Sequence, residues 1–184
     1  MQPADILSFW FQELQPKDWW VKSYDLDNRI AGRFGECHLA ASLGELESWR
    51  RQGREYSASG LLAEIIVLDQ FSRNIFRDSP KAFAQDAQAL TLSQLAVSLG
   101  LDSTLTDSEK QFLYMPYMHS ESRVIHQHAV PLFKALGDDK GYSFELKHKE
   151  IIDRFGRYPH RNSILGRQST DEELEFLQQP GSSF

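Results

Sequence analysis

Cysteine is almost missing from this chain, since Cys37 is the only one in 184 residues. A single cysteine excludes an internal disulfide framework and any zinc site built from several cysteines, and it favours a reducing compartment. No stretch approaches the roughly 18 consecutive apolar residues of a membrane-spanning helix. The opening residues 1–5 lack the charged and apolar regions of a signal peptide. We therefore expect a cytoplasmic protein that does not bind membranes.

Positive charge is also scarce, with 20 Lys and Arg against 26 Asp and Glu and a net charge of −6. Nucleic-acid binding depends on neutralising phosphates, so we expect no nucleic-acid partner. The charge is uneven, however. Residues 147–167 carry six basic and two acidic side chains, a local excess of +4, which leaves −10 on the rest of the chain. This pattern predicts an anion site. The alternative is that these arginines neutralise an acidic face of their own fold.

Strand-like alternation is missing, whereas helical periodicity runs almost from end to end. About eight helices joined by short connections predict an all-α fold of antiparallel helix pairs, in a bundle or an α-solenoid. The length favours one domain over residues 1–178, with a frayed tail at 179–184. The expected helices cover residues 3–15, 25–44, 45–51, 57–74, 80–100, 106 to a break at Pro116, 120–137, 142–155 and a short segment after Ser169.

Asp69 and Arg73 are the first candidate site residues. The apolar stripe that passes through Leu62 and Ile66 runs directly into this carboxylate and this guanidinium, and their i, i+4 spacing lets them pair. One interpretation is a structural ion pair beside Asn74. The other is the wall of a pocket, in which Arg73 faces a ligand and Asp69 orients it.

Histidines supply the second group of candidates. His148 lies on an apolar stripe with Phe144, Ile151 and Phe155, so we expect it to point inward, either as a core residue or as a catalyst. Glu145 and His148 have the Glu-x-x-His spacing of di-iron bundles, but the sequence contains one such motif. We therefore expect no metal.

His119 and Glu121 follow the helix break expected at Pro116. They could form an acid–base pair in which the carboxylate fixes the imidazole tautomer. Alternatively, Ser120 and Glu121 cap a helix and His119 is a bystander. His126 and His128 are two residues apart, so they should face different directions. Cys37 lies on the apolar stripe of its own helix and is expected to be buried core.

Four motifs together resemble a bacterial family of unknown function, family 924. They are Trp19–Trp20, Leu68–Arg77, Tyr114–Glu121 and Phe155–Asn162, and they occur in order over essentially the whole chain. The resemblance implies helices similar to tetratricopeptide-like α/α superhelices, and it implies no activity or cofactor. Ser72 departs from the family motif, which has proline there, so the helix break after Phe71 is in question.

These observations predict one polar pocket that binds a small anionic molecule or a peptide carboxylate, in an enzyme or in a binding protein. The alternative function is a tetratricopeptide-like peptide-binding module, with Trp19, Trp20 and Tyr158 at the rim of a groove. In a third interpretation the motifs are buried ion pairs that hold the fold. The ligand-binding candidates are Arg73, Asn74, Arg157, Arg161 and Asn162, and the acid–base candidates are Asp69, His119, Glu121, His148 and His160.

Overall fold

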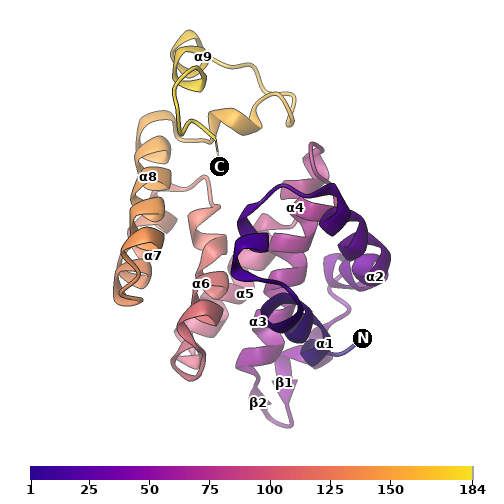
Figure 1. The fold of residues 1–184 in the computed structure, drawn as a ribbon. Helices are drawn as coiled ribbons and strands as arrows, with labels where there is room; N and C mark the ends of the chain where they lie inside the picture. Colours follow the sequence, from indigo (N-terminus) through magenta and orange to yellow (C-terminus); the bar gives the residue numbers. More distant parts are fainter. Residues whose placement is uncertain (184) are drawn as a thin grey trace. The chain divides into compact units, whose positions relative to one another are not determined.

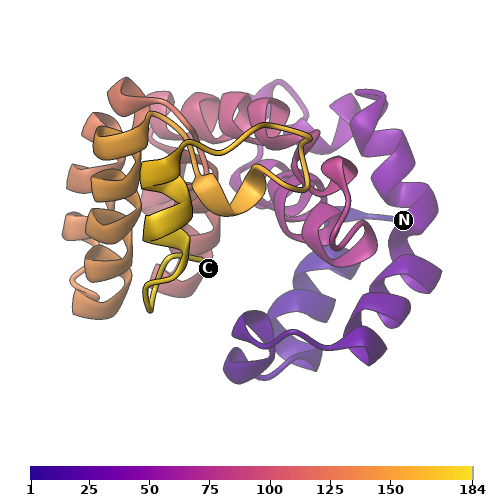
Figure 2. The same ribbon diagram turned by 90° about the horizontal axis from the view of Figure 1, so that it is seen from above.

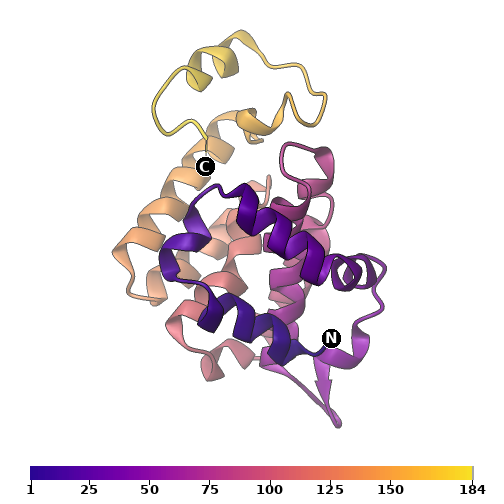
Figure 3. The ribbon, with the colours of Figure 1, turned by 45° about the vertical axis from the view of Figure 1, so that its right-hand side comes forward.

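The computed structural model describes residues 1–183 and consists almost entirely of helices, which confirms the all-α prediction (Figure 1). The one exception to the expected absence of strands is a hairpin of two-residue strands, β1 and β2, which pair antiparallel and lie at one end of their part of the molecule (Figure 3). The elements are α1 Pro3–Ser8, α2 Tyr24–Ser42, β1 Arg51–Gln52, β2 Glu55–Tyr56, α3 Ala58–Ile66, α4 Ser72–Ile75, α5 Asp86–Ser98, α6 Asp107–Met118, α7 Arg123–Ala135, α8 Asp139–Phe155 and α9 Asp171–Leu177.

The chain forms two compact units. Unit 1 contains Met1–Arg77 and Lys81–Pro116, and unit 2 contains Asp78–Pro80 and the chain from Tyr117 onward. Each unit has buried apolar residues of its own. The single domain over residues 1–178 and the superhelical arrangement stay predictions.

The core of unit 1 is aromatic. Phe9 packs against Phe34 and Phe71, with ring centroids 4.8 and 6.1 Å apart. Trp10 contacts Phe71 and Phe112, at 5.7 and 5.4 Å. These rings come from α2, from α6 and from two π-helical turns, and each is at most 1% exposed. Large apolar surface buried in this way is the main stabilising contribution to a fold.

Several boundaries in unit 1 differ from the sequence prediction, including that of the helix expected at 80–100, which begins at Asp86 after a 3₁₀ turn at Pro80–Phe83. The first helix continues beyond α1 as a π-helical segment, Phe9–Glu13, and α2 begins one residue after Ser23, whose hydroxyl accepts from the Leu26 N–H. A 3₁₀ turn, Glu47–Arg50, replaces the helix expected at 45–51. Pro116 lies inside α6 instead of breaking it. Because α6 ends two residues later, the proline removes a single backbone hydrogen bond near the helix end.

Unit 2 is built on the pair α7 and α8, which lie side by side (Figures 1 and 2). Arg123 at the start of α7 donates hydrogen bonds to the carbonyl oxygens of Ile152 and Asp153 at the end of α8. Helix α9 lies at that same end of α8, where the rings of Phe155 and Phe176 are 5.1 Å apart (Figure 1). The free carbonyl groups at the C-terminal end of α8 favour the positive charge of Arg123.

The C-terminal residues fold back onto unit 2 as far as they are described. Ser182 is buried, and its hydroxyl donates to the carbonyl oxygen of Leu177. Of the tail predicted for 179–184, Phe184 lies outside the described residues. No helix within residues 1–183 combines the length and the apolar character that crossing a membrane requires.

Candidate functional site

Unit 2 contains a buried polar cluster around Tyr158. Gly156 ends α8 in the left-handed conformation, with φ of 70°, and a 3₁₀ turn at Pro159–Arg161 follows. This reversal places the Tyr158 ring between α7 and α8, where it is 0% exposed. We call the following group the Tyr158 cluster: His126, Glu145, His148, Tyr158, His160 and Arg161.

The Tyr158 hydroxyl is tied to the segment before α7. It donates to the carbonyl oxygen of Met118 at 2.5 Å and lies 3.2 Å from Nε2 of His126. That Nε2 is also 2.9 Å from the carbonyl oxygen of Ser120. A carbonyl oxygen only accepts, so Nε2 of His126 carries a hydrogen.

Glu145 and His126 are both completely buried, and they face each other across α7 and α8. Oε1 of Glu145 lies 2.8 Å from Nδ1 of His126, whereas Oε2 has no hydrogen-bond partner. Burial raises the pKa of Glu145 above its ordinary value, and His126 partly offsets this. An unpartnered buried oxygen costs about 1–3 kcal/mol, and more if it is charged. The pair therefore lowers the stability of the core, which argues against a purely structural role.

Two further imidazoles flank the Tyr158 ring, with centroids 5.7 Å away for His148 and 5.5 Å away for His160. Burial lowers the pKa of His148 to about 3, and burial with the nearby charge of Arg161 lowers the pKa of His160 to about 4. Both rings are therefore uncharged at neutral pH. Nδ1 of His148 donates to the carbonyl oxygen of Phe144 at 2.8 Å, so its Nε2 is the nitrogen with the lone pair.

Arg161 completes the cluster. Its guanidinium lies over the Tyr158 ring, 4.6 Å from the centroid, and donates to the carbonyl oxygen of His119 at 3.1 Å. The residue is 6% exposed. Stacking on an aromatic face together with a planar hydrogen bond fixes the orientation of an arginine.

The other arginines predicted to hold an anion engage carboxylates of the fold. Arg157 forms a two-pronged ion pair with Glu173, at 2.6 and 2.7 Å, and also donates to the Gln168 carbonyl oxygen. In unit 1, Arg73 contacts both Asp69 and Asp86 at 2.9 Å. The predicted pairing of Asp69 with Arg73 is confirmed. Their contacts are those of structural ion pairs, and their ligand role stays a prediction.

Glu121 is bound by a residue that the sequence did not single out. Arg167 donates to both of its oxygens, at 2.6 and 2.9 Å, and the Tyr158 N–H donates at 2.7 Å. Burial alone would raise the pKa of Glu121, but these hydrogen bonds lower it below its ordinary value. Glu121 is thus a carboxylate at neutral pH, and its pairing with His119 as acid and base stays a prediction.

The two asparagines predicted to bind ligand also have partners within the fold. Asn74 donates to Asp27 at 2.8 Å, and Arg77 donates to both oxygens of the same carboxylate. Asn162 donates to Ser169 at 3.0 Å and accepts from Arg167 at 2.9 Å. These contacts organise loops of unit 1 and unit 2 respectively.

The site residues predicted from the sequence divide between the two units. Asp69, Arg73 and Asn74 lie in unit 1, whereas His119, Glu121, His148, Arg157, His160, Arg161 and Asn162 lie in unit 2. Their union in one pocket stays a prediction. The sequence missed the pairs of Glu145 with His126 and of Glu121 with Arg167. His126 could have been recognised from its spacing with Ala129 and Phe133, which are buried on the same face of α7, while His128 is exposed as expected.

Two expectations about aromatic residues were wrong. Phe144 is 39% exposed, and Glu145 takes the inward position beside the confirmed inward residue His148. Tyr158 is buried, so it is not at the rim of a groove. No group of three or more His, Cys, Asp or Glu side chains arranged to hold a metal occurs between residues 1 and 183.

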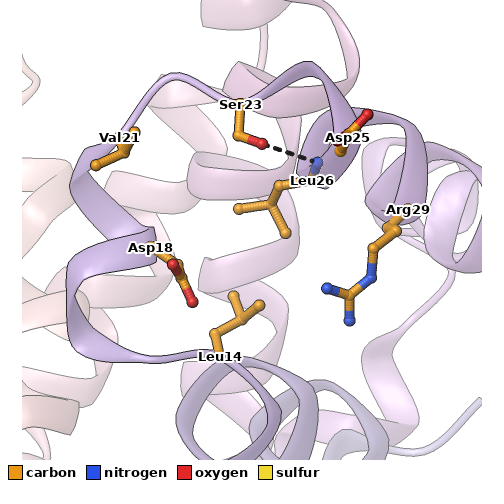
Figure 4. A pocket seen from close by; sticks show the side chains of 7 residues that line it. All are labelled: Leu14, Asp18, Val21, Ser23, Asp25, Leu26 and Arg29. Atoms are coloured by element: carbon orange, nitrogen blue, oxygen red, sulfur yellow. Dashed lines mark hydrogen bonds between the residues drawn. The ribbon is translucent and has the colours of Figure 1, made fainter.

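A pocket of about 280 Å³ opens in unit 1, and none of the predicted site residues lines it (Figure 4). The Asp18 carboxylate and the Arg29 guanidinium lie on opposite sides of Leu14 and Leu26 (Figure 4). The exposed side chains of Trp20 and Tyr24 belong to the same segment of the chain. The pocket is lined by Leu14, Asp18, Val21, Ser23, Asp25, Leu26 and Arg29.

Comparison with known proteins gives a family without an assigned activity. No curated protein matches the chain significantly. A solved structure, ATU0120, a protein of unknown function from Agrobacterium tumefaciens, matches with a TM-score of 0.89 and 35% identity over 96% of each chain. The family model described as bacterial protein of unknown function, DUF924, matches residues 6–181. The chain therefore belongs to the DUF924 family.

Proposed function

We propose that the Tyr158 cluster binds a small anionic ligand, a phosphate or a carboxylate. The observation that carries the proposal is the combination of a buried guanidinium and two uncharged imidazoles around one aromatic ring. A guanidinium matches the two oxygens of a carboxylate or phosphate. Neutral imidazoles can donate a hydrogen bond to the ligand or accept one from it.

Arg161 is the proposed cation of the site. Its ring stacking and its bond to the His119 carbonyl oxygen fix the orientation of the guanidinium. His148 and His160 are the proposed imidazole contacts of the ligand, because their lowered pKa values keep both rings uncharged at neutral pH.

Titration of the protein with inorganic phosphate and with acetate, followed by NMR of the imidazole resonances, tests the proposal. We expect the signals of His148 and His160 to shift and Arg161→Gln to weaken binding about 10- to 100-fold, since a charge-assisted hydrogen bond contributes about 1.5–3 kcal/mol. Arg154→Gln is the matched control, because Arg154 belongs to the same basic segment but is exposed and pairs with Glu172. Equal losses in both variants would show nonspecific attraction and reject the site.

A second candidate function is a tetratricopeptide-like peptide-binding module. The pocket in unit 1, with the exposed Trp20 and Tyr24 in the segment that lines it, favours this candidate. Binding to an immobilised peptide library tests it. Trp20→Ala should remove the signal, whereas Leu99→Ala, at another exposed apolar position of unit 1, should retain it. Loss in both variants, or in neither, would count against a peptide groove at this place.

A further inference from the structure

The hydrogen bonds of His126 and Glu145 require a fixed number of hydrogens. Four acceptor or donor atoms lie in a row: the Ser120 carbonyl oxygen, Nε2 and Nδ1 of His126, and Oε1 of Glu145. The first contact is 2.9 Å and the last is 2.8 Å, so each is a hydrogen bond and each needs one hydrogen. The two side chains must together hold two protons.

Loss of one of these protons breaks a contact wherever the remaining one resides. If Nε2 keeps it, the lone pair of Nδ1 faces a carboxylate. If Nδ1 takes it, the lone pair of Nε2 faces the Ser120 carbonyl oxygen. Either arrangement sets acceptor against acceptor in a fully buried place.

We propose that Glu145 and His126 form a proton-dependent clamp, which holds α7, α8 and the Tyr158 turn together and opens when the pair loses one proton. Glu145 is a positioning residue in this proposal, because it acts through His126 on Ser120 and Tyr158. The clamp goes beyond the proposed anion site and does not require a ligand.

The surroundings of the pair support this assignment. Tyr158 from the turn after α8 contacts His126. Two groups of α8 act on the pair from a distance, His148 on His126 and Lys149 on Glu145. Oε2 of Glu145 has no hydrogen-bond donor. Burial without a donor costs less for an uncharged acid than for a carboxylate, which favours the protonated pair. Burial, against a smaller opposing effect of His126, raises the pKa of Glu145. The folded contacts need both protons and the unfolded chain does not, so stability from the clamp is lost as the pH rises.

Urea denaturation of the wild type and of Glu145→Gln between about pH 5 and pH 9 tests the clamp. In the wild type, the ratio of folded to unfolded protein should fall by up to tenfold per pH unit as the pH rises. The variant should lack this decline, because the glutamine amide donates to Nδ1 at every pH. Glu150→Gln, the same change at an exposed position of α8, should follow the wild type. Parallel curves for the wild type and Glu145→Gln would overturn the proposal.

Local opening and the proton positions provide a second readout. Amides of residues 156–162 should exchange faster at high pH in the wild type than in Glu145→Gln, after correction for intrinsic exchange. The imidazole nitrogen spectrum of the wild type should show a hydrogen on Nε2 of His126 at neutral pH. An Nε2 without a hydrogen would reject the clamp, and this spectrum decides the matter if Glu145→Gln does not fold.

Discussion

Ser72 shows how one side chain affects the local backbone of this protein. The resemblance led us to expect proline at this position, and the chain remains helical there, since a π-helical turn at Val67–Phe71 leads directly into α4. The Ser72 hydroxyl donates to the Leu68 carbonyl oxygen at 2.5 Å and accepts from Nε2 of His38 at 2.7 Å. The break expected after Phe71 is therefore replaced by a buried hydrogen-bond chain.

The Asp69–Arg73 ion pair predicts a large effect from one substitution. The Asp69 side chain is 1% exposed, so Asp69→Asn removes a buried charge from the pair, while Arg73 keeps its contact with Asp86. We expect a loss of about 2 kcal/mol in the free energy of unfolding, because buried hydrogen bonds to a charged group are weakened. Asp107→Asn is the control, because the Asp107 side chain is 79% exposed beside Lys110, and it should change stability by less than about 0.5 kcal/mol. Similar losses in urea denaturation would contradict the structural role of the buried pair.

Glu173 predicts a pH dependence in acid. Its hydrogen bond from Arg157 lowers the pKa of Glu173 to about 2, against a smaller opposing effect of burial. The folded protein releases this proton more readily than the unfolded chain. The stabilisation is therefore complete above the unfolded pKa of about 4.3 and is lost as the pH falls towards 2. Glu173→Gln should lower stability at pH 7 and flatten the acid limb of the curve. An acid limb as steep as that of the wild type would contradict this.

Among the helices, α8 shows where periodicity alone chose the wrong neighbour. Phe144 and Glu145 both have an acceptable helical spacing to His148, and the apolar ring was the natural choice for the inward position. The structure buries Gly141, Glu145, His148 and Ile152 on one stripe instead. Glu145 can be buried because His126 of α7 meets it, and that partner is visible only when the two helices are packed.

Two glycines, one inside a helix and one at a helix end, predict opposite effects of the same substitution. Gly156→Ala places a side chain at a φ of 70°, so it should destabilise the end of α8 by about 1 kcal/mol. Gly32→Ala lies in the interior of α2, where an added Cβ meets nothing within 4 Å, and should stabilise by about 1 kcal/mol. Thermal or urea denaturation of both variants measures these changes in stability. Changes of the same sign would contradict these conformations.

At the scale of the molecule, the structure changes the interpretation of the basic segment 147–167. The excess of +4 over residues 147–167 falls to +1 when the three carboxylates bound to its arginines, Glu121, Glu172 and Glu173, are included. Much of the basic segment thus neutralises unit 2 itself, as one of the two sequence interpretations stated. The argument for an anion site depends on Arg161 and its imidazole neighbours instead of on the sum of charges.

The two units offer a direct test of the single-domain prediction. All four tryptophans, Trp10, Trp19, Trp20 and Trp49, lie in unit 1, so their fluorescence reports on that unit, whereas far-UV circular dichroism reports on helices of both. Helix α6 runs through the boundary at Pro116, and helix formation is cooperative. We expect the two urea transitions to coincide. A fluorescence midpoint distinct from the dichroism midpoint would show separate domains.

The sequence alone determined the features that depend on near neighbours in the chain. The spacing of Ile30, Phe34, Cys37 and Ala41 correctly predicted the buried face of α2, and the i, i+4 spacing correctly paired Asp69 with Arg73. Such contacts follow from the geometry of one helix.

Only the tertiary structure decided which distant polar groups meet. Glu145 pairs with His126 across 19 positions, and Arg167 reaches Glu121 across 46. No local period relates residues at such separations, because their contact depends on how α7, α8 and the following turns pack. The Tyr158 cluster therefore emerged from packing, although most of its members were already visible as unusual residues in the sequence.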